Sequence, residues 1–289
     1  TIGLIIMSLI LGFTLGSNGE EGRSFIEDLN QANDVSILSA LTGGIIFNLS
    51  NLLIVAAIDI AGMAIAFPIA VGIALVLGVI VNFIADPSGN PILIFGGVGL
   101  VTVAIIISAL AYRTLPENKG NASVKGITVA VISGLIMGFF YRFVAASISF
   151  DFHNPESGKM TPYTAVFIFS LGIFLSNFLW NSYFMYKPLK GEPVMYADYF
   201  TKGNFKIHLV GILGGLIWNT GMSMSLIASN QAGPTVSYGL GQGATMVGMI
   251  WGVFIWKEFK TAPKSTNKLI VAMFGFFIAG LTLLILAKS

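Results

Sequence analysis

Apolar runs of about twenty residues dominate the sequence and limit what it can fold into. A helix of that length crosses the roughly 30 Å hydrocarbon core of a bilayer. Hydrophobic residues make up 55% of the chain and charged residues only 10%, whereas about a quarter of a soluble domain is charged. The runs are also too continuous for barrel strands, which alternate in polarity over about ten residues. The sequence therefore predicts an all-α integral membrane protein.

Nine transmembrane helices are predicted from these runs. They cover residues 1–17, 36–58, 62–84, 92–112, 124–148, 161–185, 206–229, 233–256 and 267–287. The polar segments between them are too short to form a soluble domain. Residues 1–289 are therefore predicted to make a single membrane domain.

Two of the predicted helices occur twice. Residues 43–84 align without a gap with residues 214–255, at an offset of 171. Identical pairs include Gly43/Gly214, Gly44/Gly215, Asn48/Asn219, Ala57/Ala228, Ala61/Ala232, Gly62/Gly233, Gly72/Gly243 and Phe83/Phe254. The copies are five helices apart, so they face opposite sides of the membrane. Such inverted-topology repeats are typical of secondary transporters that hold their substrate near the bilayer midplane.

The repeat also predicts how the chain divides into halves. The first half is expected over residues 1–112 and the second over residues 124–287. Because the first half has one helix fewer and Thr1 already lies in an apolar run, we expect ten helices in a five-plus-five arrangement, with the first absent from this sequence. The alternative is a chain that naturally has nine helices.

The distribution of Lys and Arg predicts the orientation, because cytoplasmic loops accumulate positive charge. One side carries Arg113, Lys119, Lys125, Lys187, Lys190, Lys202, Lys206, Lys257, Lys260, Lys264 and Lys268. The other side carries Arg23, Lys159 and Lys288. The loops after residues 112, 185 and 256 are therefore predicted to be cytoplasmic. The acidic external loop over residues 18–35, which includes Glu20 and Glu21, is interpreted as a solvated connection.

Buried amides are the strongest candidates for a substrate site. At about 1.5 Å per residue, Asn48 and Asn219 lie about 18 and 20 Å into their spans, near the midplane. An amide in hydrocarbon is costly unless it pairs with protein, water or substrate. The repeat would let the two amides converge on a polar neutral solute, with Asn51 and Ser223 on the same helical faces. The alternative is that both amides connect helices.

Four further residues complete the predicted site. The indole of Trp218 can stack on a sugar ring or a heterocycle and donate its N–H, although a lone tryptophan within a membrane span more often serves packing. Gln242 lies at middle depth in the following helix and Tyr238 nearer its outer end. Arg142 lies inside its span, where it can bind an anion or a carbonyl-rich solute, or extend to the interface.

Catalysis and metal binding find no support in the sequence. His153 and His208 lack metal-ligand spacing, and no serine, histidine and acid can be placed at one depth. We therefore predict no enzyme activity, metal, cofactor or nucleic-acid partner. The expected partners are a small solute, the lipid bilayer and a coupling proton or sodium ion. No acid is seen within a span, since Asp59 and Glu258 lie at helix ends.

Three stretches carry a resemblance to a known family. They are AGMAIAFPIAVGIALVLGV over residues 61–79, LGGLIWN over residues 213–219 and WKEF over residues 256–259. Together with the repeat they resemble the drug/metabolite transporter superfamily, in the branch of glucose/ribose porters, rhamnose permeases and ureide permeases. The resemblance implies a central cavity with Asn48, Trp218, Asn219 and Gln242 in or near it. It gives Glu258 a structural role.

The combined prediction is a secondary transporter that moves a small polar neutral solute, a sugar or a ureide-like compound, by alternating access. An exporter of drugs or metabolites on the same fold is one alternative. A membrane scaffold or sensor that transports nothing is another. The short loops favour a bacterial inner membrane.

Overall fold

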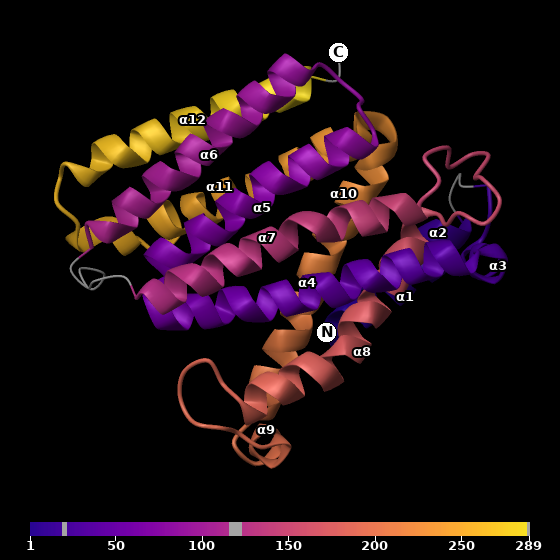
Figure 1. Ribbon diagram of the computed structural model, residues 1–289, viewed down its shortest axis with the longest axis horizontal. Helices are drawn as coiled ribbons and strands as arrows, with labels where there is room; N and C mark the ends of the chain where they lie inside the picture. The colour runs from indigo at the N-terminus through magenta and orange to yellow at the C-terminus, as the bar shows by residue number, and fades with distance from the viewer. Residues whose placement is uncertain (19–21, 116–122, 288–289) are drawn as a thin grey trace. The chain divides into compact units, whose positions relative to one another are not determined.

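The computed structural model describes residues 1–18, 22–115 and 123–287 (Figure 1). Lys119, Lys288, Glu20 and Glu21, which entered the charge argument, lie outside the described residues. The helices are α1 (Ile2–Phe13), α2 (Leu15–Asn18), α3 (Phe25–Gln31), α4 (Asp34–Ala61), α5 (Met63–Ala85), α6 (Pro91–Arg113), α7 (Val124–Ser147), α8 (Pro162–Tyr186), α9 (Tyr196–Thr201), α10 (Phe205–Gly241), α11 (Gly243–Ile250) and α12 (Thr266–Leu286). A π-helical turn, Trp251–Ile255, follows α11, and a 3₁₀ turn, Glu258–Thr261, precedes α12.

Seven helical stretches of the described chain are long and apolar enough to cross a membrane. One of them, Phe205–Ile255, is 51 residues long, and a shorter apolar stretch covers Ile2–Asn18. The all-helical, multi-pass architecture is thus confirmed. The number of nine helices stays a prediction, because it requires the long stretch to count twice and the short one to span.

Two glycines break the apolar helices at positions related by the repeat. Gly62 alone joins α4 to α5, and its φ and ψ are 83° and 150°. Gly233 lies within α10 and has φ 76° and ψ 155°. A positive φ is accessible to glycine without the steric cost that a Cβ adds. The two glycines thus match in backbone conformation as well as in residue type.

The chain forms two compact units that are each discontinuous in sequence. Unit 1 comprises Thr1–Leu52 and Phe140–Gln231, and unit 2 comprises Leu53–Phe139 and Ala232–Ser289. The boundaries fall inside α4, α7 and α10. Each unit therefore takes segments from both predicted halves of the repeat.

Unit 1 is held together by close helix contacts at small residues. A Cβ on Gly44 of α4 would lie 2.2 Å from the backbone oxygen of Phe169 in α8. Gly215, the counterpart of Gly44 in the repeat, lies in α10 with the Cα of Gly3 of α1 only 3.0 Å from where its own Cβ would be. Backbones that approach this closely are typical of membrane helices with small residues at the interface.

A buried ion pair closes one end of unit 1. The Nε of Arg23 donates to Oδ1 of Asp28 at 3.0 Å, and Asp28 is fully buried. The backbone N–H of Thr161 donates to Oδ2 of Asp28 at 2.7 Å. Arg23 also donates to the carbonyl oxygens of Glu156 and Lys159, at 3.1 and 2.8 Å. The interpretation of this loop as a solvated connection is therefore wrong for Asp28, because Arg23 and Thr161 replace its water.

In unit 2, α6 and α12 lie side by side along their length (Figure 1). A Cβ on Gly97 would lie 2.8 Å from the carbonyl oxygen of Gly280, and the reverse distance is the same. Val101, Phe277 and Leu284 are buried in the same unit. Two glycines facing each other therefore set the closest approach of these helices.

Candidate functional site

Four aromatic rings form a cluster in unit 1, and two of them are related by the repeat. Phe47 of α4 and Trp218 of α10 are 171 residues apart, and their ring centroids are 4.7 Å apart with an interplanar angle of 36°. Phe169 stacks with Trp218 at 6.2 Å and 22°, and Phe140 lies 5.1 Å from Phe47. We call Phe47, Phe140, Phe169 and Trp218 the aromatic cluster. Trp218 is 37% exposed, so part of its ring lies at the surface of the protein.

Asn48, the residue after Phe47, connects α4 to α8. Its Nδ2 donates to Oγ of Ser176 at 3.0 Å and to Oδ1 of Asn177 at 3.3 Å. Only 4% of Asn48 is exposed. Its amide donors therefore serve a contact between helices.

Asn219, the residue after Trp218, makes the corresponding connection from α10 to α1. Its Nδ2 donates to the backbone oxygen of Leu4 at 2.8 Å. Asn219 is fully buried, and its Oδ1 has no hydrogen-bond partner among the described residues. The contact across the repeat is thus made by Phe47 and Trp218, while the two amides donate to other helices. The Oδ1 of Asn219 is buried and has no partner among the described residues.

The other predicted residues of unit 1 have different surroundings. Ser223 is buried, and its hydroxyl donates to the backbone oxygen of Asn219 at 2.8 Å, one turn earlier in the same helix. Asn51 is exposed and Arg142 is half-buried. In the described part of the chain, neither forms a hydrogen bond or a ring contact with the aromatic cluster. The structure thus groups Trp218, Asn219 and Ser223 on neighbouring turns of α10.

Tyr238 and Gln242 belong to unit 2. The hydroxyl of Tyr238 donates to the backbone oxygen of Ala74 at 2.9 Å, and its ring packs over Gly78. Tyr238 is only 3% exposed, and its hydroxyl group is used in the hydrogen bond to α5. Gln242 is half-buried at the start of α11. These residues therefore connect elements within unit 2.

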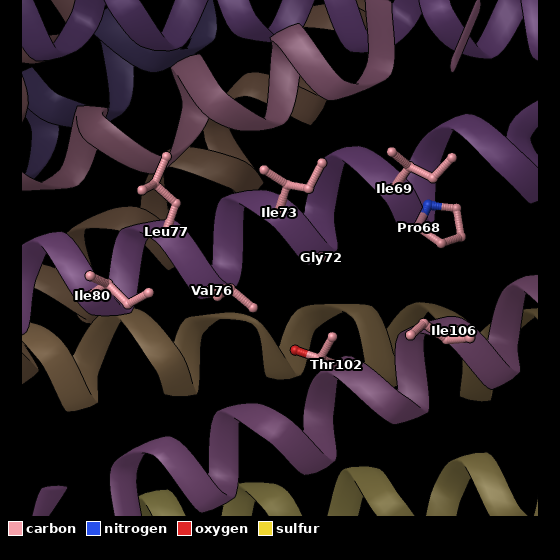
Figure 2. Close-up of a pocket in the computed structure, with 9 residues that line it drawn as sticks. All are labelled: Pro68, Ile69, Gly72, Ile73, Val76, Leu77, Ile80, Thr102 and Ile106. Atoms are coloured by element: carbon pink, nitrogen blue, oxygen red, sulfur yellow. The ribbon is translucent and has the colours of Figure 1, made fainter. Parts of the chain in front are cut away.

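A groove of about 440 Å³ runs along α5 and α6 in unit 2 (Figure 2). Figure 2 shows Ile73, Val76 and Thr102 among the nine residues that line it. Thr102 is the only lining residue with a polar side chain, and its hydroxyl donates to the backbone oxygen of Val98 at 2.8 Å. A polar solute would lose its hydrogen bonds to water here without replacement. The groove suits an acyl chain better than a polar substrate.

Phe47 is the residue of the aromatic cluster that our sequence reasoning missed although a signal was present. The repeat alignment pairs it directly with Trp218. Its apolar character hid it, because only polar residues and a tryptophan were considered as candidates. A ring that pairs with a candidate across a repeat is itself a candidate.

Apolar helices that carry buried amides and a partly accessible aromatic cluster define a multi-pass membrane protein of the solute-transporter class. The model of the ureide permease family matches residues 1–119 and 113–287. The chain belongs to the ureide permease family, and it is a permease rather than an enzyme.

Two of the following three relatives are named ureide permeases. Ureide permease 1 of Arabidopsis thaliana is 21% identical, in an alignment that covers 100% of this chain and 88% of the relative. Ureide permease 4 of the same plant is 22% identical, over 99% of this chain and 87% of its own length. Transmembrane protein 144 homolog A of Dictyostelium discoideum is 24% identical, but over 56% of this chain and 39% of its own length.

Proposed function

We propose that this permease moves a small, polar, uncharged solute of the ureide kind by alternating access. The observation that carries the proposal is the pairing of an accessible Trp218 ring with the unpartnered, buried Oδ1 of Asn219 on adjacent residues. The ring offers a flat apolar surface to a planar solute. The amide oxygen accepts a hydrogen bond from an N–H group, which ureides carry and which a purely apolar drug lacks.

The neutrality of the solute follows from the residues around the ring. The aromatic cluster and the two amides bring together aromatic rings, amides, a hydroxyl and a backbone oxygen. A charged solute would have to leave water without a compensating charge at these contacts. The names of the relatives favour a ureide over a sugar, which the same residues would also accommodate.

The inverted repeat is part of the proposal, and two structural observations support it. Gly62 and Gly233 share one unusual backbone conformation. Asn48 and Asn219 each donate to a helix outside the repeated segments. On the same basis we propose the ten-helix arrangement, the kinship with drug/metabolite transporters and the link to the sugar porters.

Coupling to a proton or to sodium completes the proposed cycle.

The integral membrane location rests on the seven long apolar stretches of the described chain. The relatives named above come from a plant and from Dictyostelium, so they lend no support to a bacterial inner membrane.

Uptake into proteoliposomes tests the proposal. The purified full chain is offered radiolabelled hydantoin, a planar cyclic ureide, beside a sugar, a nucleobase and a cationic drug. We expect saturable uptake of hydantoin and a loss of about tenfold in uptake efficiency with Trp218→Leu. Trp251→Leu, which replaces another exposed tryptophan, is the matched control. Uptake of the cation alone, or equal effects of the two variants, would contradict the proposal.

A further inference from the structure

A second cavity, of about 280 Å³, lies within unit 2 among α5, α6, α11, α12 and the turn that contains Glu258. Phe67, Ser108, Tyr112, Thr245, Trp256 and Glu258 are among its lining residues, and we call it the Glu258 pocket. Unlike the groove of Figure 2, it contains a carboxylate and three hydroxyl groups. Its volume is just below the roughly 300 to 1,000 Å³ typical of drug-sized ligands. It is therefore suited to a small solute.

Two departures from regular helix and one glycine place the Glu258 carboxylate. The chain first widens into the π-helical turn Trp251–Ile255, a feature that often occurs at functional sites. Lys257 then adopts a left-handed conformation, with φ 54° and ψ 40°, at a cost of about 1 kcal/mol for a residue with a Cβ. Finally, Oε2 of Glu258 would lie 2.7 Å from a Cβ on Gly252. A side chain at position 252 would therefore displace the carboxylate from this place.

The hydrogen bonds of the pocket leave it rich in acceptors. The hydroxyl of Tyr112 donates to Oε2 of Glu258 at 2.8 Å. The hydroxyl of Ser108 donates to the sulfur of Met249 at 3.3 Å, and that of Thr245 to the backbone oxygen of Gln242 at 2.6 Å. All three hydroxyl protons are thus engaged, while oxygen lone pairs remain.

Glu258 also lacks a basic partner in the described part of the chain, where its one side-chain hydrogen bond comes from Tyr112. A half-buried carboxylate with a single donor has unused acceptor capacity and an incompletely replaced hydration shell. A ligand for this pocket should therefore bring donors. The aromatic rings of Phe67, Trp256 and Phe277 supply flat apolar walls, which favour a planar ligand.

We propose that the Glu258 pocket binds a small planar solute through its N–H groups, which donate to the Glu258 carboxylate and to the hydroxyl oxygens of Ser108 and Thr245. The class of solute rests on the proposed function, since ureides are planar and rich in N–H donors. The pocket is a binding site in addition to the aromatic cluster, because all of its lining residues belong to unit 2. Neither our sequence reasoning nor the relatives' names assign Glu258 this role.

A single-tryptophan reporter separates this site from the aromatic cluster. The chain has four tryptophans, and Trp180→Phe, Trp218→Phe and Trp251→Phe together leave Trp256 as the only one. Hydantoin should change the fluorescence of Trp256 in a saturable manner. Hydantoin methylated on both nitrogens should bind at least about tenfold more weakly, because it has lost both donors. Equal binding of the two compounds would overturn the proposal.

Substitutions then identify the residues responsible. In the reporter, Glu258→Gln should weaken hydantoin binding about tenfold, because it removes the charge of the acceptor and introduces a competing donor. Glu192→Gln, at an exposed loop acid, should leave binding unchanged. If Glu258 only anchored the helix end through Tyr112, Tyr112→Phe would reproduce the loss, and this result would overturn the proposal.

A steric variant guards against misfolding of the charge variant. Gly248 lines the pocket, and a Cβ there meets no atom within 4 Å, so Gly248→Leu should fill the cavity without a backbone clash. Gly99 is equally open but lies outside the pocket, which makes Gly99→Leu the control. We expect only Gly248→Leu to abolish the fluorescence change, with melting temperatures alike. If hydantoin uptake is lost while binding at Trp256 is intact, the result counts against the transport function alone. If uptake is intact but hydantoin does not bind at Trp256, the result counts against the Glu258 pocket alone.

Discussion

At the residue scale, the midspan amides act through the helices that they connect. The Nδ2 of Asn219 fixes α10 to the backbone of α1, and Asn48 fixes α4 to α8. Hydrogen bonds between membrane helices contribute about 0.6 kcal/mol on average and up to about 1.7 kcal/mol. The amides therefore orient the adjacent rings of the aromatic cluster as well as stabilising the fold.

Asn219→Ala should lower the stability of the permease by about 1 kcal/mol, because the buried carbonyl of Leu4 loses its donor. Asn51→Ala, at an exposed position in α4, should have no measurable effect. Thermal unfolding of the detergent-solubilised chain compares the two. Equal melting temperatures for both variants would mean that the amide contact has no stabilising role.

The buried ion pair of unit 1 should matter far more than an exposed one. Asp28→Asn leaves the guanidinium of Arg23 without its charge partner at a buried position, which should cost about 3 kcal/mol. Asp198→Asn removes the exposed pair with Lys202, where the lysine side chain is 75% accessible, and surface pairs contribute little. Melting temperatures should therefore fall for the first variant and stay constant for the second.

At the element scale, the two glycine kinks set where each repeated helix pair turns. Gly62→Ala and Gly233→Ala should each destabilise the chain by about 1 to 2 kcal/mol, because alanine is strained at a positive φ. At Gly62 no atom lies within 4 Å of an added Cβ, so the effect there is due to the backbone alone. Gly211→Ala, in regular helix with equally open surroundings, should be neutral or stabilising. Chemical-denaturant or thermal unfolding distinguishes these outcomes.

The elements followed from the sequence further than the site did. Apolar length predicted the all-helical, multi-pass architecture, and the repeat alignment paired Gly62 with Gly233. Periodicity does not show which neighbour a buried amide will reach, so the sequence alone left open whether Asn48 and Asn219 bind a solute or connect helices. In the structure the donors of both amides connect helices. The pocket around Glu258 was missed because it depends on a left-handed Lys257 and a π-helical turn, and neither has a signature in residue type.

At the scale of the whole molecule, each unit should move as one body during transport. Thr114 and Thr266 both belong to unit 2, and their hydroxyl oxygens are 2.8 Å apart. The chain contains no cysteine, so Thr114→Cys with Thr266→Cys gives one disulfide without competition. Oxidation should leave hydantoin uptake unchanged, because the bond joins α6 to α12 within one unit. Loss of uptake that is restored by reduction would show that these helices must separate.

The division of each unit into distant sequence segments has a consequence for synthesis in the cell. Unit 1 needs residues up to Gln231, and α6 of unit 2 must wait for α12 at the other end of the chain. Helices that pack together but lie so far apart in sequence assemble slowly. The helices made first lack their neighbours while the rest of the chain is being synthesised. The newly inserted helices of this permease therefore stay without part of their native contacts until α12 has been made.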